Sequence, residues 1–134
     1  MIKYQMGFKY QLVAQYRDNI GVKIPNEVKY AWFSITPTGE ICIRKGYAWD
    51  GPSGPTIDTR NFMRGSLVHD VLYQAIRLEL LPQEFRQTAD AILRDICIED
   101  GMSRIRAWWV YTGVRIGAGP AAMPSAERQV MVAP

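Results

Sequence analysis

The stretch DGPSGPTIDT, residues 50–59, constrains the fold of this chain more than any other. It holds two Gly, two Pro and two Asp in ten positions. Proline removes a backbone donor and Gly weakens regular structure, so this stretch can form neither a regular helix nor a central strand. Apolar residues follow a period near two before it and recur at three- to five-residue spacing after it. We therefore expect a loop that divides a β-rich N-terminal part from a helical part.

The N-terminal part contains strand-like runs rich in aromatic and β-branched residues. We expect strands in FKYQLVAQY (residues 8–16), KYAWFSIT (29–36) and EICIRKGYAW (40–49). In the last run, Ile41 and Ile43 alternate with less apolar residues, which is typical of a strand with one solvated face. Thr38 and Gly39 stand between the last two runs and predict a hairpin turn.

After the loop the spacing predicts three helices. They are RNFMRGSLVHDVLYQAIRLELL (residues 60–81), PQEFRQTADAILRDICIEDG (82–101) and SRIRAWWVYTGVRIG (103–117). Pro82 suits a first helical turn, and Gly101 predicts the end of the second helix. We expect the third helix to pack through an apolar stripe, and Trp108 and Trp109 to lie in the core and at an interface. The stripe consists of Ile105, Trp108, Trp109, Thr112 and Ile116.

These elements predict an α+β fold, with an N-terminal antiparallel β hairpin or meander followed by a three-helix part. We expect one domain over residues 1–119, comprising a β-rich segment 1–49, a loop 50–60 and a helical segment 61–117. Residues 120–134, PAAMPSAERQVMVAP, contain three Pro and no lasting periodicity. They predict an extended arm, either a frayed terminus or a segment that docks on a neighbouring subunit.

Composition excludes several classes of protein. Lys and Arg are scattered and the net charge is only +3, so we expect no nucleic-acid binding. No run of eighteen apolar residues is present, and the start MIKYQMGFKY has no signal-peptide pattern. Two cysteines, Cys42 and Cys97, are too few for a disulfide framework and predict reduced thiols in a protein made in a cytosol.

His69 is the single histidine of the chain, and it is followed directly by Asp70. One imidazole excludes zinc sites that need two or three histidines. His69 and Tyr73 are four residues apart and share a helical face. If the first two helices form an antiparallel hairpin about residue 80, Asp90 is placed to reach His69. The result is either a buried polar network or a general base whose imidazole is oriented by a carboxylate.

Asp70 is turned by about 100° from His69 around the helix, toward the preceding loop if that loop wraps back. A carboxylate beside the backbone carbonyls of a Gly/Pro loop is a natural site for a hard cation such as Ca²⁺. The alternative for the loop is a plain connector made of turn residues. Asp58, near its end, is expected to cap the first helix.

The motif HDVLY, after a Gly-containing loop and before a helix with RQTADAILRD, resembles secreted phospholipase A2, closest to its small bacterial and fungal branch. The resemblance covers about residues 46–98. It implies that His69 is the general base, Asp90 the orienting carboxylate, Tyr73 the supporting hydroxyl and Asp70 the calcium carboxylate. It also implies calcium ligands in the loop: Trp49, Asp50, Gly51 and Gly54. The chain departs from that family in its prolines and in its lack of a disulfide framework.

A second resemblance spans about residues 46–117. The segments GYAWDGPSGP, HDVLY, RQTAD and WWVYTGVRIG are similar to a family of small proteins from tailed-bacteriophage genomes whose activity is not known. This resemblance implies a virion component, associated with the tail or its tip and made in the host cytoplasm. Its expected partners are other tail proteins, bound through the arm 120–134 and through Trp108 and Trp109. The expected function is a virion protein that hydrolyses membrane lipid esters; the alternative is a purely structural protein.

Overall fold

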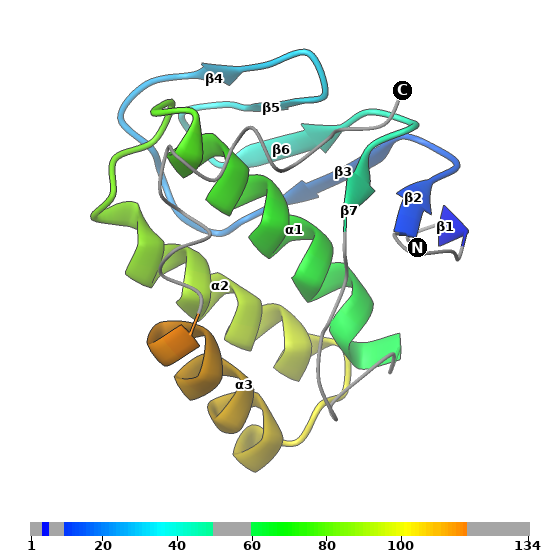
Figure 1. Cartoon of the computed structure of the whole chain (residues 1–134), viewed down its shortest axis with the longest axis vertical. Coiled ribbons are helices and arrows are strands. Elements are labelled where there is room, and N and C mark those ends of the chain that lie inside the picture. Colours follow the sequence, from blue (N-terminus) through cyan, green and yellow to red (C-terminus); the bar gives the residue numbers. More distant parts are fainter. Residues whose placement is uncertain (1–3, 6–9, 50–59, 118–134) are drawn as a thin grey trace. The chain divides into compact units, whose positions relative to one another are not determined.

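The computed structural model describes residues 4–5, 10–49 and 60–117 (Figure 1). Antiparallel strands come first in the chain and three helices follow, which confirms the predicted α+β class. The described strands belong to one compact unit and the described helices to another. A single domain over residues 1–119 stays a prediction. The predicted loop 50–60, apart from Arg60, and the predicted arm 120–134 lie outside the described residues.

The strands of the first unit form two antiparallel sheets. The four-stranded sheet has the order β3 (Tyr16–Asn19), β6 (Glu40–Ile43), β5 (Phe33–Ile35), β4 (Val28–Lys29). The three-stranded sheet has the order β1 (Tyr4–Gln5), β2 (Tyr10–Leu12), β7 (Ala48–Trp49). Both sheets therefore combine strands from the beginning and the end of this unit.

The hairpin predicted at Thr38 and Gly39 is confirmed. It joins β5 to β6, and Gly39 has a φ of 92° that side chains other than glycine rarely adopt. A Cβ at Gly39 would also lie 2.3 Å from the carbonyl oxygen of Val22. The alternation along β6 is confirmed too, since Ile41 and Ile43 are buried and the residues between and beside them are not.

The prediction that each of the three runs forms one continuous strand is wrong. The structure divides 8–16 into β2 and β3, 29–36 into β4 and β5, and 40–49 into β6 and β7. Two of these breaks occur where the chain passes from one sheet to the other, which requires a bend. At the second bend Gly46 has a φ of 96°. The break in 29–36 is a tight turn in which the Tyr30 N–H donates to the Phe33 carbonyl.

The helices of the second unit are α1 (Arg60–Arg77), α2 (Phe85–Glu99) and α3 (Arg104–Gly117). Helix α1 ends four residues earlier than predicted, because the N–H groups of Leu80 and Leu81 fold back onto the Ala75 carbonyl. Glu79 has a φ of 61° in this turn. Pro82 lies in the connection before α2 and not in its first turn, so that prediction is wrong as well. Within the described part of the chain, no helix is both long and apolar enough to cross a membrane.

The end of α2 follows the prediction made for Gly101. Its φ is 102°, and its N–H donates to the Ile98 carbonyl at 3.0 Å. The next N–H, of Met102, donates to the Cys97 carbonyl at 2.9 Å. These two bonds form a Schellman motif, which satisfies the last carbonyl groups of the helix. The Ser103 hydroxyl then accepts a hydrogen bond from the Arg106 N–H and caps α3.

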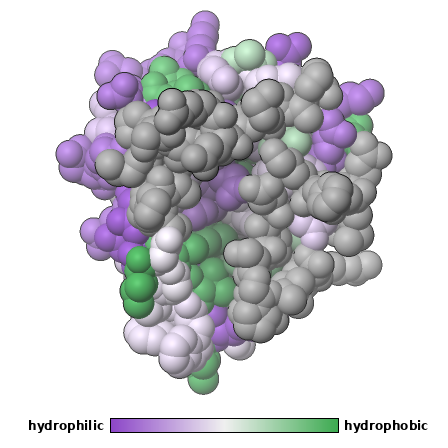
Figure 2. Space-filling view, viewed as in Figure 1, coloured by the Kyte–Doolittle hydropathy of each residue, from purple (hydrophilic) through white to green (hydrophobic). Residues whose placement is uncertain are grey.

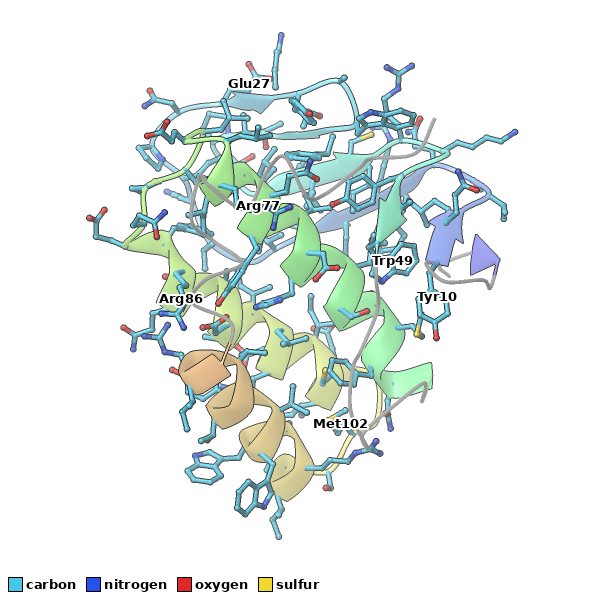
Figure 3. All side chains as sticks on the ribbon, in the orientation of Figure 1. Tyr10, Glu27, Trp49, Arg77, Arg86 and Met102 are labelled. Carbon is cyan, nitrogen blue, oxygen red and sulfur yellow. The ribbon has the colours of Figure 1, made fainter. Side chains whose placement is uncertain are left out.

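Helix α3 packs through the face opposite to the predicted one. Its buried residues are Ala107 and Val110. They belong to an apolar cluster with Phe62, Leu93, Cys97 and Met102, the last labelled between α2 and α3 in Figure 3. Trp108 and Trp109 are exposed, so their predicted place in the core is wrong. The small side chain of Ala107 lets the backbone of α3 approach its neighbours, whereas the indoles would hold it away.

Candidate functional site

A candidate site forms where α1 and α2 pack closely against each other. Gly65 on α1 makes this approach feasible, since a Cβ there would lie 2.9 Å from Leu93 Cδ1 and 3.0 Å from Cys97 Sγ. Farther along the same pair, His69 and Tyr73 of α1 meet Asp90 of α2. The antiparallel hairpin expected from the sequence therefore brings these three side chains together.

The Asp90 carboxylate is fully buried and accepts hydrogen bonds from three side chains. Its Oδ1 lies 2.7 Å from His69 Nε2 and 2.6 Å from the Tyr73 hydroxyl. Its Oδ2 lies 3.0 Å from Nη1 of Arg115 on α3. We call these four residues the Asp90 cluster. The rings of His69 and Tyr73 also contact each other, with centroids 4.1 Å apart.

Arg86, labelled on α2 in Figure 3, adds a second set of contacts among the three helices. Its Nε donates to the Tyr73 hydroxyl at 3.1 Å and so bridges α1 and α2. Its Nη2 donates to the carbonyls of Arg115 at 2.8 Å and Val114 at 3.2 Å, in the last turn of α3. A guanidinium at this place satisfies carbonyl groups that the helix leaves without partners.

The sequence did not reveal the part that Arg115 plays. A basic residue in the last turn of a helix is ordinary, because it complements the helix dipole. Arg115 also lies outside the apolar stripe that the sequence predicted to pack, so no periodicity marked it as inward-facing. Only the packing of α3 on α2 brings its guanidinium to Asp90.

The electrostatics of the Asp90 cluster favour an ionised carboxylate beside a basic imidazole. Burial lowers the pKa of His69, but Asp70 and Asp90 together outweigh it and leave the pKa raised. Burial raises the pKa of Asp90, but the hydrogen bonds from His69 and Tyr73 and the neighbouring positive charges leave it lowered. Burial and the Asp90 charge raise the pKa of Tyr73, which stays a neutral donor. Since Nε2 of His69 faces the carboxylate, Nε2 carries the proton of the neutral imidazole, and Nδ1, 4.0 Å from Asp70 Oδ1, is the atom that gains a proton when His69 becomes positively charged.

Asp70 is partly exposed, and its Oδ1 lies 4.0 Å from His69 Nδ1. Its carboxylate oxygens are of the kind that Ca²⁺ binds, but calcium takes six to eight oxygen ligands. Across the described ranges, no group of three or more His, Cys, Asp and Glu side chains could hold a metal. The further ligands predicted at Asp50, Gly51 and Gly54 lie outside the described residues. A calcium site at Asp70 therefore stays a prediction that depends on oxygens of the loop.

Trp49, predicted to offer a backbone ligand, lies in β7. Its indole is buried and packs against Tyr10 with ring centroids 5.6 Å apart, and both residues are labelled in Figure 3. The side chain thus has a structural role in the β unit. The two cysteines are free thiols, and burial raises the pKa of Cys97 to about 12, which makes that thiol unreactive.

Fold and site together define an α+β protein whose helical unit holds a buried His–Asp pair, supported by a tyrosine and an arginine. The chain belongs to the family described as protein of unknown function DUF1353, whose model matches residues 26–114. The matched region includes three members of the Asp90 cluster and ends one residue before Arg115. Searches of curated proteins and of solved structures found no significant match.

Proposed function

We propose that this protein is a calcium-dependent esterase of the phospholipase A2 type, acting on ester bonds of membrane phospholipids. One observation carries the proposal: Asp90 Oδ1 lies 2.7 Å from His69 Nε2, and Tyr73 supports the same oxygen. This arrangement orients an imidazole by a carboxylate and leaves Nδ1 to receive a proton. The same residues carry the resemblance between the motif HDVLY and secreted phospholipase A2.

In the proposed reaction, water attacks the ester carbonyl carbon while His69 Nδ1 takes one proton from that water. Asp90 stabilises the imidazolium that results. The tetrahedral intermediate then expels the alcohol oxygen of the lysophospholipid, which takes the proton back from His69, and a fatty acid is released. One water is consumed for each ester cleaved. When bound by Asp70 and loop oxygens, calcium would supply positive charge for the carbonyl oxygen.

The experiment that tests this proposal is calcium calorimetry followed by phospholipid hydrolysis on the same samples. We expect calcium binding by the wild type and its loss in Asp70→Asn, because the substitution removes a charged oxygen ligand. Asp95→Asn is the matched control, since Asp95 is an exposed carboxylate on α2 that pairs with Arg94. Hydrolysis should be lost in His69→Ala while calcium binding persists. A folded wild type that binds no calcium and releases no fatty acid would overturn the proposal.

A second candidate function is favoured by the burial of the site. The His69 side chain is only 8% exposed. Over the part of the chain that the structure describes, every buried side-chain polar atom has a hydrogen-bond partner. A fully satisfied network of this kind is sufficient to hold the three helices together without any catalytic role. If neither calcium binding nor turnover is found, the Asp90 cluster is such a structural tie.

We also propose that the protein is a component of a bacteriophage particle, at the tail or its tip. The support is the resemblance of residues 46–117 to small proteins of tailed phages, and an arm at 120–134 whose composition suits docking. Mass spectrometry of purified particles tests this proposal. Stoichiometric recovery with tail proteins is expected, and absence from intact particles would contradict it.

A further inference from the structure

The outer face of α3 exposes the four most solvent-accessible large apolar side chains that the structure describes. Ile105 is 75% exposed, Trp108 56%, Trp109 64% and Ile116 80%. The other exposed large apolar residues in the described ranges reach at most 40%. We call these four residues the α3 outer face. Burying such side chains is favourable, and a soluble surface does not need them together on one helix.

The α3 outer face is continuous along the helix. Its residues recur at intervals of three, four and seven, so they lie on one side of α3. Thr112 falls within the same stripe and carries no charge. The two indoles contact each other edge to face, with centroids 5.8 Å apart. In the space-filling view, the surface over α3 at the bottom is pale and green (Figure 2).

Arginines flank the α3 outer face on both sides. At 100° per residue, Arg104 and Arg115 fall along one edge of the stripe and Arg106 falls along the other. The sequence of α3, RIRAWWVYTGVRIG, contains no acidic residue. The helix therefore combines exposed tryptophan and isoleucine with arginines on both borders, of which Arg115 is bonded to Asp90.

We propose that the α3 outer face docks on the surface of an anionic phospholipid bilayer, with α3 parallel to the membrane plane. Tryptophan prefers the membrane–water interface, isoleucine inserts at the acyl boundary, and flanking arginines are attracted by anionic headgroups. A second copy fits less well, because pairing two such faces would oppose arginines without any acidic partner from α3. A specific protein interface also engages roughly 20–30 residues on each side, far more than this narrow stripe offers.

The same helix connects this surface to the Asp90 cluster. Arg115 is bonded to Asp90, and Arg86 binds the carbonyls of the last turn of α3. One side of α3 would thus rest on lipid while its last turn holds the residues around His69. The inference extends the proposed function by naming the surface where an esterase would meet its substrate, but bilayer binding itself needs no hydrolysis.

The test uses the full chain and sucrose-loaded vesicles, either pure phosphatidylcholine or an equal mixture of phosphatidylcholine and phosphatidylglycerol. We expect the wild type to sediment with the mixed vesicles, and Trp108→Ala/Trp109→Ala to lose about tenfold or more in partition coefficient. The matched control is Leu80→Ala, which removes an exposed apolar side chain of the helical unit outside the α3 outer face. It should bind as the wild type does. Arg104→Gln/Arg106→Gln should weaken binding to mixed vesicles and reduce its dependence on salt.

Circular dichroism checks that each variant is folded, and Ile105→Gln/Ile116→Gln provides a second test if the tryptophan variant is not. Equal partitioning of the wild type and both outer-face variants would overturn the proposal. So would failure of the folded wild type to bind mixed vesicles. A dimer or a bound phage tail protein that depends on Trp108 and Trp109, without vesicle binding, would assign the face to a protein partner instead.

Hydrolysis of dihexanoyl-phosphatidylcholine as a dissolved monomer separates this inference from the proposed function. If the proposed esterase exists, the wild type and the Trp108→Ala/Trp109→Ala variant should cleave the monomer equally, and only the wild type should act efficiently on mixed vesicles. Vesicle binding without cleavage of either substrate would sustain the docking inference and reject the esterase. Cleavage of the monomer without vesicle binding would sustain the esterase and reject the docking inference.

Discussion

Two groups of charged side chains join α1 to α2 at different points of the helix pair. One is the Asp90 cluster. The other, which we call the Arg64 cluster, pairs Arg64 of α1 with Glu99 and Asp100 at the end of α2. Arg64 Nε and Nη2 both lie 3.0 Å from the Asp100 carboxylate, and Nη2 also contacts Glu99. Both groups connect α1 to α2 through hydrogen bonds with similar donor–acceptor distances.

They differ in their access to water. In the Arg64 cluster the side chains of Glu99 and Asp100 are 70% and 25% exposed, whereas Asp90 is fully buried. Removing the partner of an exposed charge costs little stability, because water screens and solvates that charge. Removing the partner of a buried charge costs much more, because no water replaces the lost hydrogen bond. Hydrogen-bond distances alone would rank the two clusters as equals. Burial predicts that the Asp90 cluster dominates stability.

The largest expected effect comes from removing the centre of the Asp90 cluster. Asp90→Ala leaves the buried His69 and Tyr73 and the half-buried Arg115 without their common acceptor, and should lower the free energy of unfolding by about 3–5 kcal/mol. Urea denaturation measures it, with Asp95→Ala on the exposed side of α2 as the matched control. A loss of unfolding free energy no larger than that of the control would show that water reaches the Asp90 cluster. The two clusters would then not differ in the way that burial predicts.

Tyr73→Phe should lower the free energy of unfolding by about 1–3 kcal/mol. The substitution keeps the ring but removes one donor to Asp90 and the acceptor for Arg86 Nε. The same urea titration measures it. His69 and Arg115 still hold Asp90 in this variant, so the effect should be smaller than in Asp90→Ala. An equal effect would mean that Tyr73, not Asp90, is the centre of the network.

The dependence of stability on pH should be a smaller effect, because neutral His69 still donates to Asp90. The pKa of His69 is raised in the folded protein, so its contribution is fully present below its ordinary pKa of about 6.5 and is lost as pH rises through the folded value. The difference in unfolding free energy between the wild type and His69→Gln should therefore shrink toward high pH. A difference that grows would contradict a raised pKa.

The smallest effect is expected in the Arg64 cluster. Glu99→Gln removes one charge from an exposed carboxylate, and Asp100 still holds Arg64. The free energy of unfolding should change by less than about 1 kcal/mol and the change should fade in high salt. Thermal denaturation at low and high salt measures it. A loss comparable to that of Tyr73→Phe would show that the two clusters are energetically alike.

Much of the fold followed from local patterns in the sequence. The Thr38–Gly39 hairpin, the alternation of Ile41 and Ile43 and the end of α2 at Gly101 were all predicted, because each depends on backbone conformations or periods that neighbouring residues impose. The division of the runs 8–16 and 40–49 between strands of two different sheets was not predicted. It depends on which strands pair, and pairing is decided by residues far apart in the chain.

The candidate site shows the same division. The sequence by itself placed His69 and Tyr73 on one helical face and put Asp90 within reach across an antiparallel hairpin, since helical spacing and a short turn determine both. Only the tertiary structure brought Arg115 to Asp90 and turned Trp108 and Trp109 outward. Both depend on which face of α3 packs against α2. The close fit of small side chains determines that face, and the periodicity of apolar residues does not show how closely side chains fit.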